Sequence, residues 1–343
     1  MKFCQRTVVL VAAVMTAGVA FADAHAMGSP DPHIRYATDA YPGFDLLEDL
    51  EETVKTPRWF GWINGPKMTN ATEQLAWCRD CEAREDWKAA LKGYDALVRA
   101  WPGAVEAPVA QEALAGLYLD RFSEYENAFA EFRYLADFYS TKCDFDATLF
   151  RMYEIAKLMR EEGKRILFFR FANTVDVRRA FEAVVVRAPG ARYVPEALLT
   201  IAELREDEGG YEQAVQAYET IRNLYPTAPE AKLSVAREAK ARMQILDDHA
   251  YNRPRCLDTI GFLKLSLADG PDLETRVVLE ESLAKAVGQL EDEAYKAAKF
   301  YDSRTRTKRS AINAYEKFLS EYPASAHADE ARRRLEELRG GER

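Results

Sequence analysis

The sequence is poor in the residues that build metal and redox centres. Of its 343 residues, five are cysteine and four are histidine. The pair Cys78 and Cys81 has no second Cys-x-x-Cys partner, and no histidine has a companion at metal-ligand spacing. A Gly-rich phosphate loop and the nucleophile elbow of hydrolases are also absent. We therefore expect no catalytic site, no metal site and no cofactor.

The sequence also lacks an excess of positive charge, and long apolar runs are scarce. The net charge of −9 disfavours binding to nucleic acid or to an acidic membrane surface. One apolar run, Val8 to Ala22, follows Lys2 and Arg6 and ends in small residues. These are features of a secretory signal peptide, and the run is too short for a transmembrane anchor. We expect cleavage after Ala22 or Ala26 and a mature chain without a transmembrane segment.

What the sequence does contain is a repeated helical pattern. A small, an aromatic, an apolar and a bulky residue recur at offsets 0, +4, +7 and +11, with proline at +12 in most copies. The five copies begin at Ala90, Ala128, Val177, Ala214 and Ala311. The first three positions share one face of a helix, and proline ends the helix because it cannot continue the hydrogen-bond ladder. Each copy is therefore predicted to be the second helix of a hairpin that buries its apolar face against its neighbours.

A small residue recurs in the helix after each joint. Eight residues after the proline stand Ala110, Ala197 and Ala331, with Ser234 close to them in size. The long interval between the last two copies has room for a degenerate unit at 251–271 and an amphipathic helix at about 273–300. The predicted fold is an all-α solenoid of five to six irregular helical hairpins with a charged C-terminal cap. The expected domains are a signal peptide at 1–26, an extended segment at 27–70 and a helical repeat domain at 71–343.

The pattern resembles tetratricopeptide repeats, whose period is about 34 residues. More narrowly, it is similar to the BamD family of periplasmic outer-membrane assembly factors. The stretches that carry this resemblance are "AFEAVVVRAPGARYVPEALLTIAEL", "YEQAVQAYETIRNLYPTAPEA" and "EAYKAAKFYDSRTRTKRSAINAYEKFLSEYPASAHADEA". The resemblance implies a non-catalytic scaffold that binds a β-barrel assembly subunit and unfolded outer-membrane protein segments.

This sequence departs from the BamD pattern in two places. Cys4 precedes the apolar run and no cysteine lies near Ala22, so no lipoprotein anchor is expected. Lys308 and Arg309 stand where small or aromatic turn residues are usual in that family. The expected location is the periplasm, with peripheral association at the inner face of the outer membrane. An alternative resemblance is to the tetratricopeptide protein of the Tol-Pal system, although five prolines between residues 27 and 70 disfavour its coiled coil. A cell-wall enzyme is a third alternative.

Three stretches are candidates for partner binding. The aromatic residues Trp59, Phe60 and Trp62 are interpreted either as a plug over the first repeat or as an interface anchor. Phe168 and Phe169 offer the same choice between packing and a peptide groove. The basic turn is either solvated or a docking patch for an acidic partner. Its candidate residues are Arg304, Arg306, Lys308 and Arg309.

The cysteines have a packing interpretation and a chemical one. Cys78 falls where other copies have Gly116 and Ala202, which favours a small residue at a helix crossing over redox or metal chemistry. A disulfide between Cys143 and Cys256 is a further hypothesis, which the sequence alone does not decide.

Overall fold

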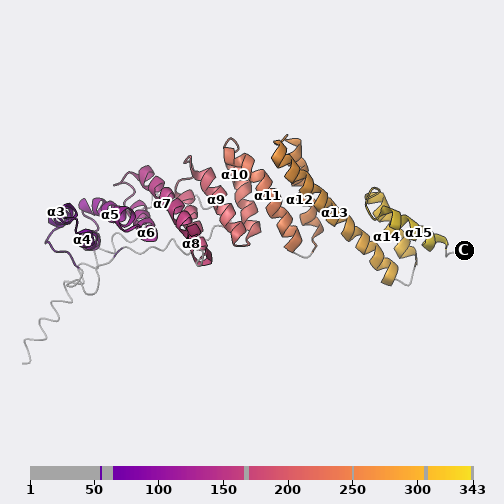
Figure 1. The fold of residues 1–343 in the computed structure, drawn as a ribbon, viewed down its shortest axis with the longest axis horizontal. Coiled ribbons are helices and arrows are strands. Elements are labelled where there is room, and N and C mark those ends of the chain that lie inside the picture. Colours follow the sequence, from indigo (N-terminus) through magenta and orange to yellow (C-terminus); the bar gives the residue numbers. More distant parts are fainter. Residues whose placement is uncertain (1–54, 56–64, 166–169, 249–250, 305–307, 341–343) are drawn as a thin grey trace, which may run out of the picture. The chain divides into compact units, whose positions relative to one another are not determined.

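The computed structural model describes residue 55 and residues 65–165, 170–248, 251–304 and 308–340. In these ranges the chain forms thirteen α-helices and a short π-helical turn, without a β-strand (Figure 1). No helix within them is both long enough and apolar enough to cross a membrane. The chain divides into two compact units between Leu204 and Arg205. The predicted all-α class is therefore correct, and each unit is described by itself.

Unit 1 consists of helices that pack against their neighbours in sequence. The α3 helix packs on α4, α5 on α6, and α7 on α8, so that each pair is a hairpin. The elements are α3 (Ala71–Ala83), α4 (Trp87–Ala100), α5 (Glu106–Leu117), η2 (Tyr118–Phe122), α6 (Tyr125–Phe138), α7 (Phe145–Arg165), α8 (Arg170–Arg187) and most of α9 (Val194–Asp207).

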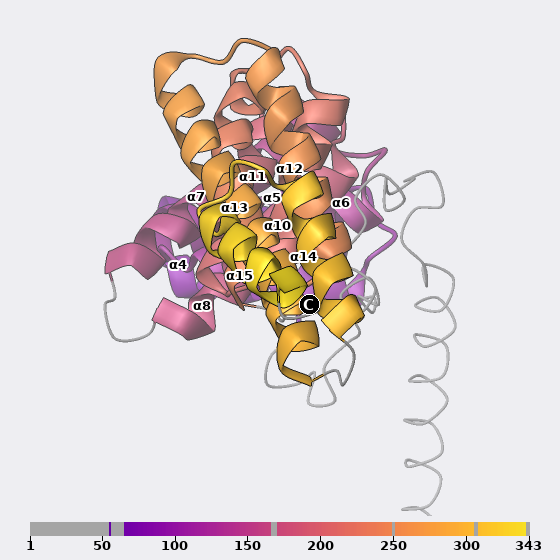
Figure 2. The same ribbon diagram turned by 90° about the vertical axis from the view of Figure 1, so that its right-hand side faces the viewer.

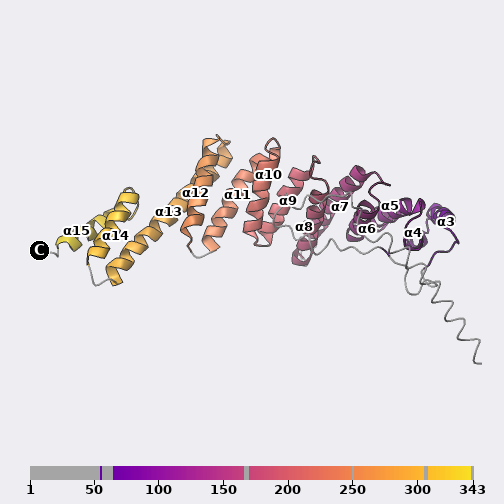
Figure 3. The same ribbon diagram turned by 180° about the vertical axis from the view of Figure 1, so that it is seen from behind.

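Unit 2 is organised around one long helix, α13. Its first half packs with α11 and α12 around Leu279 and Ala286, and its second half packs with α14 and α15 around Tyr295 and Ala298. Figure 2 shows α14 and α15 side by side, and Figure 3 shows α13 running from α12 to α14. The elements are α10 (Tyr211–Leu224), α11 (Pro229–Asp248), α12 (Arg253–Ala268), α13 (Leu273–Arg304), α14 (Lys308–Glu321) and α15 (Ala328–Gly340).

The repeated residues form the core, as the spacing predicts. The aromatic positions are at most 3% exposed in all five copies, at Tyr94, Phe132, Phe181, Tyr218 and Tyr315. Each of these helices ends one residue before the bulky +11 position. That residue's N–H still closes a last helical bond, for example from Tyr225 to the Ile221 carbonyl at 2.9 Å. Where proline follows, it lacks the donor that would extend the helix further.

The less regular parts of the repeat are also predicted correctly. The small residues at the second helix position, Ala110, Ala197, Ser234 and Ala331, are fully buried. The degenerate unit contains α12, and the long helix after it is α13. The cap helix α15 buries Ala331 and Leu335, and its arginine and glutamate side chains are mostly exposed.

Cys78 packs at a helix crossing, which confirms the structural interpretation of this residue. It is fully buried, and a Cβ added to Gly93 of α4 would lie 2.6 Å from its sulfur. Burial raises the pKa of the Cys78 thiol to about 12, which opposes thiolate chemistry. Cys143 and Cys256 belong to different units and are both free thiols in the structure, so a disulfide between them stays a hypothesis. Within the described ranges, no group of His, Cys, Asp or Glu side chains is arranged to hold a metal ion.

Candidate protein-binding groove

Most of the sequence-predicted site residues fall outside the described residues and stay predictions. These are Trp59, Phe60, Trp62, Phe168, Phe169 and Arg306. Arg304 is the last residue of α13, and its side chain is also outside the description. Lys308 and Arg309 lie in the first turn of α14, where both are exposed.

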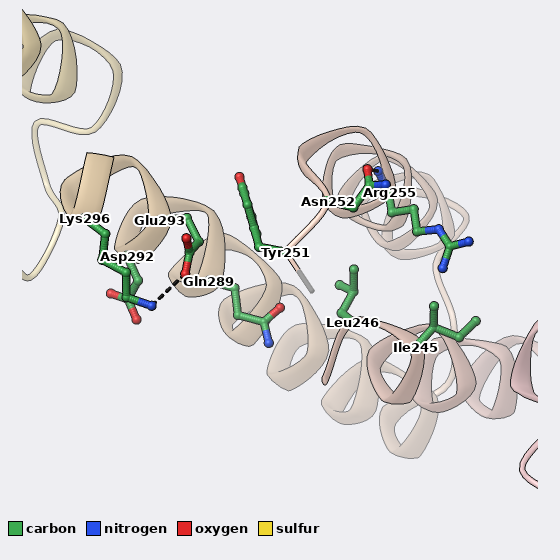
Figure 4. A pocket seen from close by; sticks show the side chains of 9 residues that line it. All are labelled: Ile245, Leu246, Tyr251, Asn252, Arg255, Gln289, Asp292, Glu293 and Lys296. Atoms are coloured by element: carbon green, nitrogen blue, oxygen red, sulfur yellow. Dashed lines mark hydrogen bonds and ion pairs between the residues drawn. The ribbon is translucent and has the colours of Figure 1, made fainter. Parts of the chain in front are cut away.

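The first part of a groove lies where α11, α12 and α13 meet (Figure 4). It encloses about 240 Å³. The apolar side is formed by Ile245 and Leu246 of α11, and Tyr251 stands beside them before α12. The opposite side is the polar face of α13. Its side chains are Gln289, Asp292, Glu293 and Lys296.

The groove continues between α10, α11 and α12. This second part encloses about 230 Å³ and shares Ile245, Leu246 and Arg255 with the first. Glu212 and Glu219 of α10 form its far side, and Glu212 forms an ion pair with Arg255 at 2.6 Å. The two parts together are called the α10–α13 groove. Such a channel, with a narrow apolar floor and charged rims, suits an extended peptide or a partner helix.

Turn chemistry at the start of α12 fixes the arrangement of Arg255. The Asn252 side chain accepts a hydrogen bond from the Arg255 N–H at 3.2 Å, which is an N-cap. Pro254 follows at the first helical turn, where its missing N–H costs nothing. The helix therefore begins at a fixed point, and Arg255 projects from its first turn between the two parts of the groove.

A buried ionic cluster supports one side of the groove. The Glu238 side chain is 0% exposed and accepts hydrogen bonds from Arg222 at 2.6 Å and from Arg242 at 2.7 Å. Arg242 also donates to Glu219 and to Asp258, so it ties α11 to α10 and α12. Burial raises the pKa of Glu238, and the two guanidinium groups oppose that rise. Because these charges pair with one another, the cluster holds the three helices in place beneath the groove.

The Phe262 ring is part of the same cluster. The Arg222 guanidinium lies 5.0 Å from the ring centroid and the Arg242 guanidinium lies 4.8 Å from it, so each makes a cation–π contact. These contacts anchor α12 to α10 and α11.

A second concavity, called the α13–α14 cavity, lies between those two helices. It encloses about 430 Å³ and is lined by alanines 294, 297, 298 and 314 together with Tyr301 and Phe318. Arg253 and Glu321 pair at its edge at 3.4 Å. Phe300 and Tyr301 are exposed beside it and contact each other edge to face. The alanines leave room for an apolar side chain of a partner.

Sequence reasoning missed both concavities. The residues of the α10–α13 groove come from four helices and have no common spacing. The exposed pair Phe300 and Tyr301 is an aromatic dipeptide on α13 that the repeat pattern does not single out. The basic turn was the only part of this region that the sequence marked as a candidate.

Comparison with known proteins supports the repeat assignment in the middle of the chain. Residues 196–228, which contain most of α9 and all of α10, match the tetratricopeptide repeat family model. No curated protein matches the chain. The all-α, TPR-like fold is therefore confirmed, and helical hairpins of this kind serve as scaffolds for protein–protein interaction.

Solved tetratricopeptide repeat proteins are among the similar structures. One is from Parabacteroides merdae ATCC 43184, at 14% identity and a TM-score of 0.28, covering 78% of this chain and 98% of that one. Another is the C-terminal part of a repeat-containing protein from Cytophaga hutchinsonii, at 13% identity and a TM-score of 0.24, covering 75% of this chain and 98% of that one.

Proposed function

We propose that this protein is an exported, non-catalytic scaffold that takes part in the assembly of outer-membrane β-barrel proteins. In this proposal the α10–α13 groove binds an extended segment of a partner or of an unfolded outer-membrane protein. The observation that carries the binding role is an open groove whose lining charges pair with other side chains of the chain. The assembly role rests on the resemblance of the repeat stretches to the BamD family.

The groove is suited to binding chains of varied sequence. Ile245 and Leu246 offer an apolar floor, and the charges on the rims have both signs. The unfolded outer-membrane protein segments of this proposal alternate apolar and polar residues. An apolar floor with charges of both signs on its rims therefore accepts many different sequences. The α13–α14 cavity, with its exposed aromatic pair, is proposed to hold an apolar side chain of the assembly partner.

Site-specific photo-crosslinking in the native host tests this proposal. A photoreactive residue is placed at Gln289 in the groove, and a matched one at the exposed Lys240, which is on α11 and does not line the groove. We expect crosslinks from position 289, and not from 240, to an outer-membrane assembly subunit and to outer-membrane protein precursors. Crosslinks to Tol-Pal components would favour the alternative envelope role, and equal crosslinking from both positions would contradict binding in the groove.

The export part of the proposal is tested separately. Mass spectrometry of the mature protein from fractionated cells reads its first residue and any attached lipid. We expect a mature chain beginning after Ala22 or Ala26, without acylation, in the periplasmic or outer-membrane fraction. A chain that retains residues 1–22 in the cytoplasm would overturn the proposed location.

A further inference from the structure

The side chain of Lys55 is inserted among three helices of unit 1. It is 12% exposed, although the residue lies sixteen positions before the first described helix. Its ammonium group pairs with Glu131 of α6, and it lies near Gln111 of α5 and Asp95 of α4. A lysine is rarely buried in this way unless its charge is paired. The buried position of the Lys55 ammonium therefore depends on these specific polar partners.

The acceptors around the Lys55 ammonium match what a lysine offers. The Nζ atom contacts Glu131 Oε2, lies 3.5 Å from Gln111 Oε1 and lies 4.0 Å from Asp95 Oδ1. Three acceptors thus surround a group that has three N–H donors and no acceptor. The Tyr134 ring adds a cation–π contact, with its centroid 5.0 Å from Nζ, and the Tyr134 hydroxyl accepts a hydrogen bond from the Lys55 backbone N–H at 3.2 Å.

The orientation of Gln111 is set before any lysine arrives. Gln111 is fully buried, and its Nε2 donates to the Glu131 carbonyl at 2.8 Å and to Glu131 Oε2 at 2.6 Å. Because both partners are acceptors, the amide nitrogen must face them, and the amide oxygen then faces the Lys55 ammonium. The pocket is thus pre-organised to accept hydrogen bonds from a cation.

The charge balance of the pocket also calls for one added cation. Asp95 is already paired with Arg99 of its own helix at 2.8 Å. Among the described residues, Lys55 is the only cation paired with Glu131. A compact ammonium fits between converging acceptors, whereas the planar guanidinium of arginine needs a carboxylate that faces its fork.

We propose that Asp95, Gln111, Glu131 and Tyr134 form a lysine-binding site, occupied in the resting protein by the chain's own Lys55. When Lys55 is removed, the site takes a lysine from an extended peptide in its place. Such a site lets a lysine of a partner segment compete with Lys55 for the same acceptors on α4, α5 and α6. The proposal is independent of the groove in unit 2.

Lysine footprinting on the full chain tests occupancy of the site. The protein is acetylated with an activated ester, and the rate at each lysine is read by mass spectrometry. The exposed Lys67 serves as an internal reference. Because its ammonium is buried and paired, Lys55 should react about tenfold more slowly than Lys67. Glu131→Gln, which keeps an acceptor but removes the charge, should raise the Lys55 rate towards that of Lys67. Equal rates in the unmodified protein, or undiminished protection in the Glu131→Gln variant, would overturn the proposal.

A peptide in trans tests whether the site recognises lysine itself. The probe is a synthetic peptide of residues 50–60, and the control peptide has norleucine in place of lysine. In the Lys55→Met chain, calorimetry should show binding of the lysine peptide about tenfold tighter than that of the norleucine peptide. The unmodified chain should bind the lysine peptide more weakly, because its own lysine fills the site. Equal binding of the two peptides would refute recognition. Circular dichroism and thermal unfolding verify that each variant is folded.

Discussion

Glu131 of unit 1 and Glu238 of unit 2 are both carboxylates held among helices, and they are neutralised in different ways. Glu238 pairs with two arginines, Arg222 of α10 and Arg242 of α11. Glu131 pairs with Lys55, which comes from outside the helices of the repeat. The first cluster is complete once the helices have packed. The second is completed by Lys55, which is not on any of these helices, so in our proposal a lysine from another chain can take its place.

The difference between Glu131 and Glu238 is not a general difference between unit 1 and unit 2. Unit 1 also has a closed pair, in which Arg187 of α8 donates to both carboxylate oxygens of Asp137 at 2.8 Å. In both clusters the partners lie on helices of the repeat itself, and Glu131 is a departure from that arrangement. The difference indicates that closed clusters fix the scaffold, whereas an open one is suited to recognition.

The largest expected effect is from opening the closed cluster in unit 2. Glu238→Ala leaves Arg222 and Arg242 without their shared carboxylate. Because these guanidinium groups are largely buried, the free energy of unfolding should fall by about 3 kcal/mol. Urea denaturation followed by circular dichroism measures this change.

Glu219→Ala is the matched control for this substitution. It removes one partner of the same Arg242, but the Glu219 side chain is 40% exposed, and water replaces the lost contact. The expected loss is below about 1 kcal/mol. If the two variants lost equal stability, Glu238 would not be the centre of the cluster and the contrast with Glu131 would fail.

The sequence predicts the repeat packing well because that packing is local. The small and aromatic positions of each copy recur at helical spacing, so Tyr218 and Tyr315 could be assigned to the core without a structure. Proline predicts the helix end in four of the five copies, and all five helices end at the same offset. Packing between successive helices thus leaves a periodic signal.

The sites leave a weaker signal because they combine residues from several helices. Nothing in the spacing of Asp95, Glu131 and Lys55 indicates that they meet. One residue did carry information: Gln111 occupies a position that the period of α5 assigns to the core, between Ala107 and Leu114, and it is fully buried. A polar residue at a core position requires a hydrogen-bond partner, so Gln111 is the residue by which the sequence indicates the proposed lysine site.

A substitution of intermediate effect tests whether the lysine site depends on a close helix crossing. In Gly93→Ala the new Cβ would lie 2.6 Å from Cys78 Sγ and from the Trp77 ring, so α3 and α4 must move apart. Overpacking of this kind should cost about 2 kcal/mol. Because Asp95 is on the same helix, the acetylation rate of Lys55 should also rise.

Gly116→Ala is the control for Gly93→Ala, because it replaces a glycine by alanine without crowding a neighbouring helix. Gly116 is the next-to-last residue of α5, where the chain continues into η2, and a Cβ added there would have no neighbouring atom within 4 Å apart from the adjacent backbone. Alanine should therefore stabilise the protein by about 0.5 kcal/mol and leave Lys55 protected. Destabilisation by both substitutions would point to a general intolerance of the first hairpins and would remove the link to the site.

The smallest expected effect on stability comes from a carboxylate whose arginine partner is partly exposed to solvent. Asp302 of α13 accepts hydrogen bonds from Arg334 of α15 at 2.7 and 3.1 Å and from the Tyr315 hydroxyl at 3.2 Å. The hydrogen bond from Arg334 is the main reason that the pKa of Asp302 is lowered from 3.8. Because Arg334 is 44% exposed, Asp302→Asn should cost only about 1 kcal/mol at pH 7.

The pH dependence of that cost distinguishes an ionic contact from packing. A lowered pKa in the folded state means that the stabilisation is complete above the unfolded value of 3.8 and is lost as the pH falls through the folded value. The difference between Asp302→Asn and the unmodified protein should therefore be constant near neutral pH and shrink below pH 3.8. Asp329→Asn is the control, because the Asp329 side chain is 92% exposed and its pair with Arg332 should contribute little at either pH. If the loss of stability in Asp302→Asn stayed the same in acid, Asp302 would act through packing and not through its charge. The comparison of paired carboxylates in Glu238 and Glu131 would then not extend to the C-terminal hairpin.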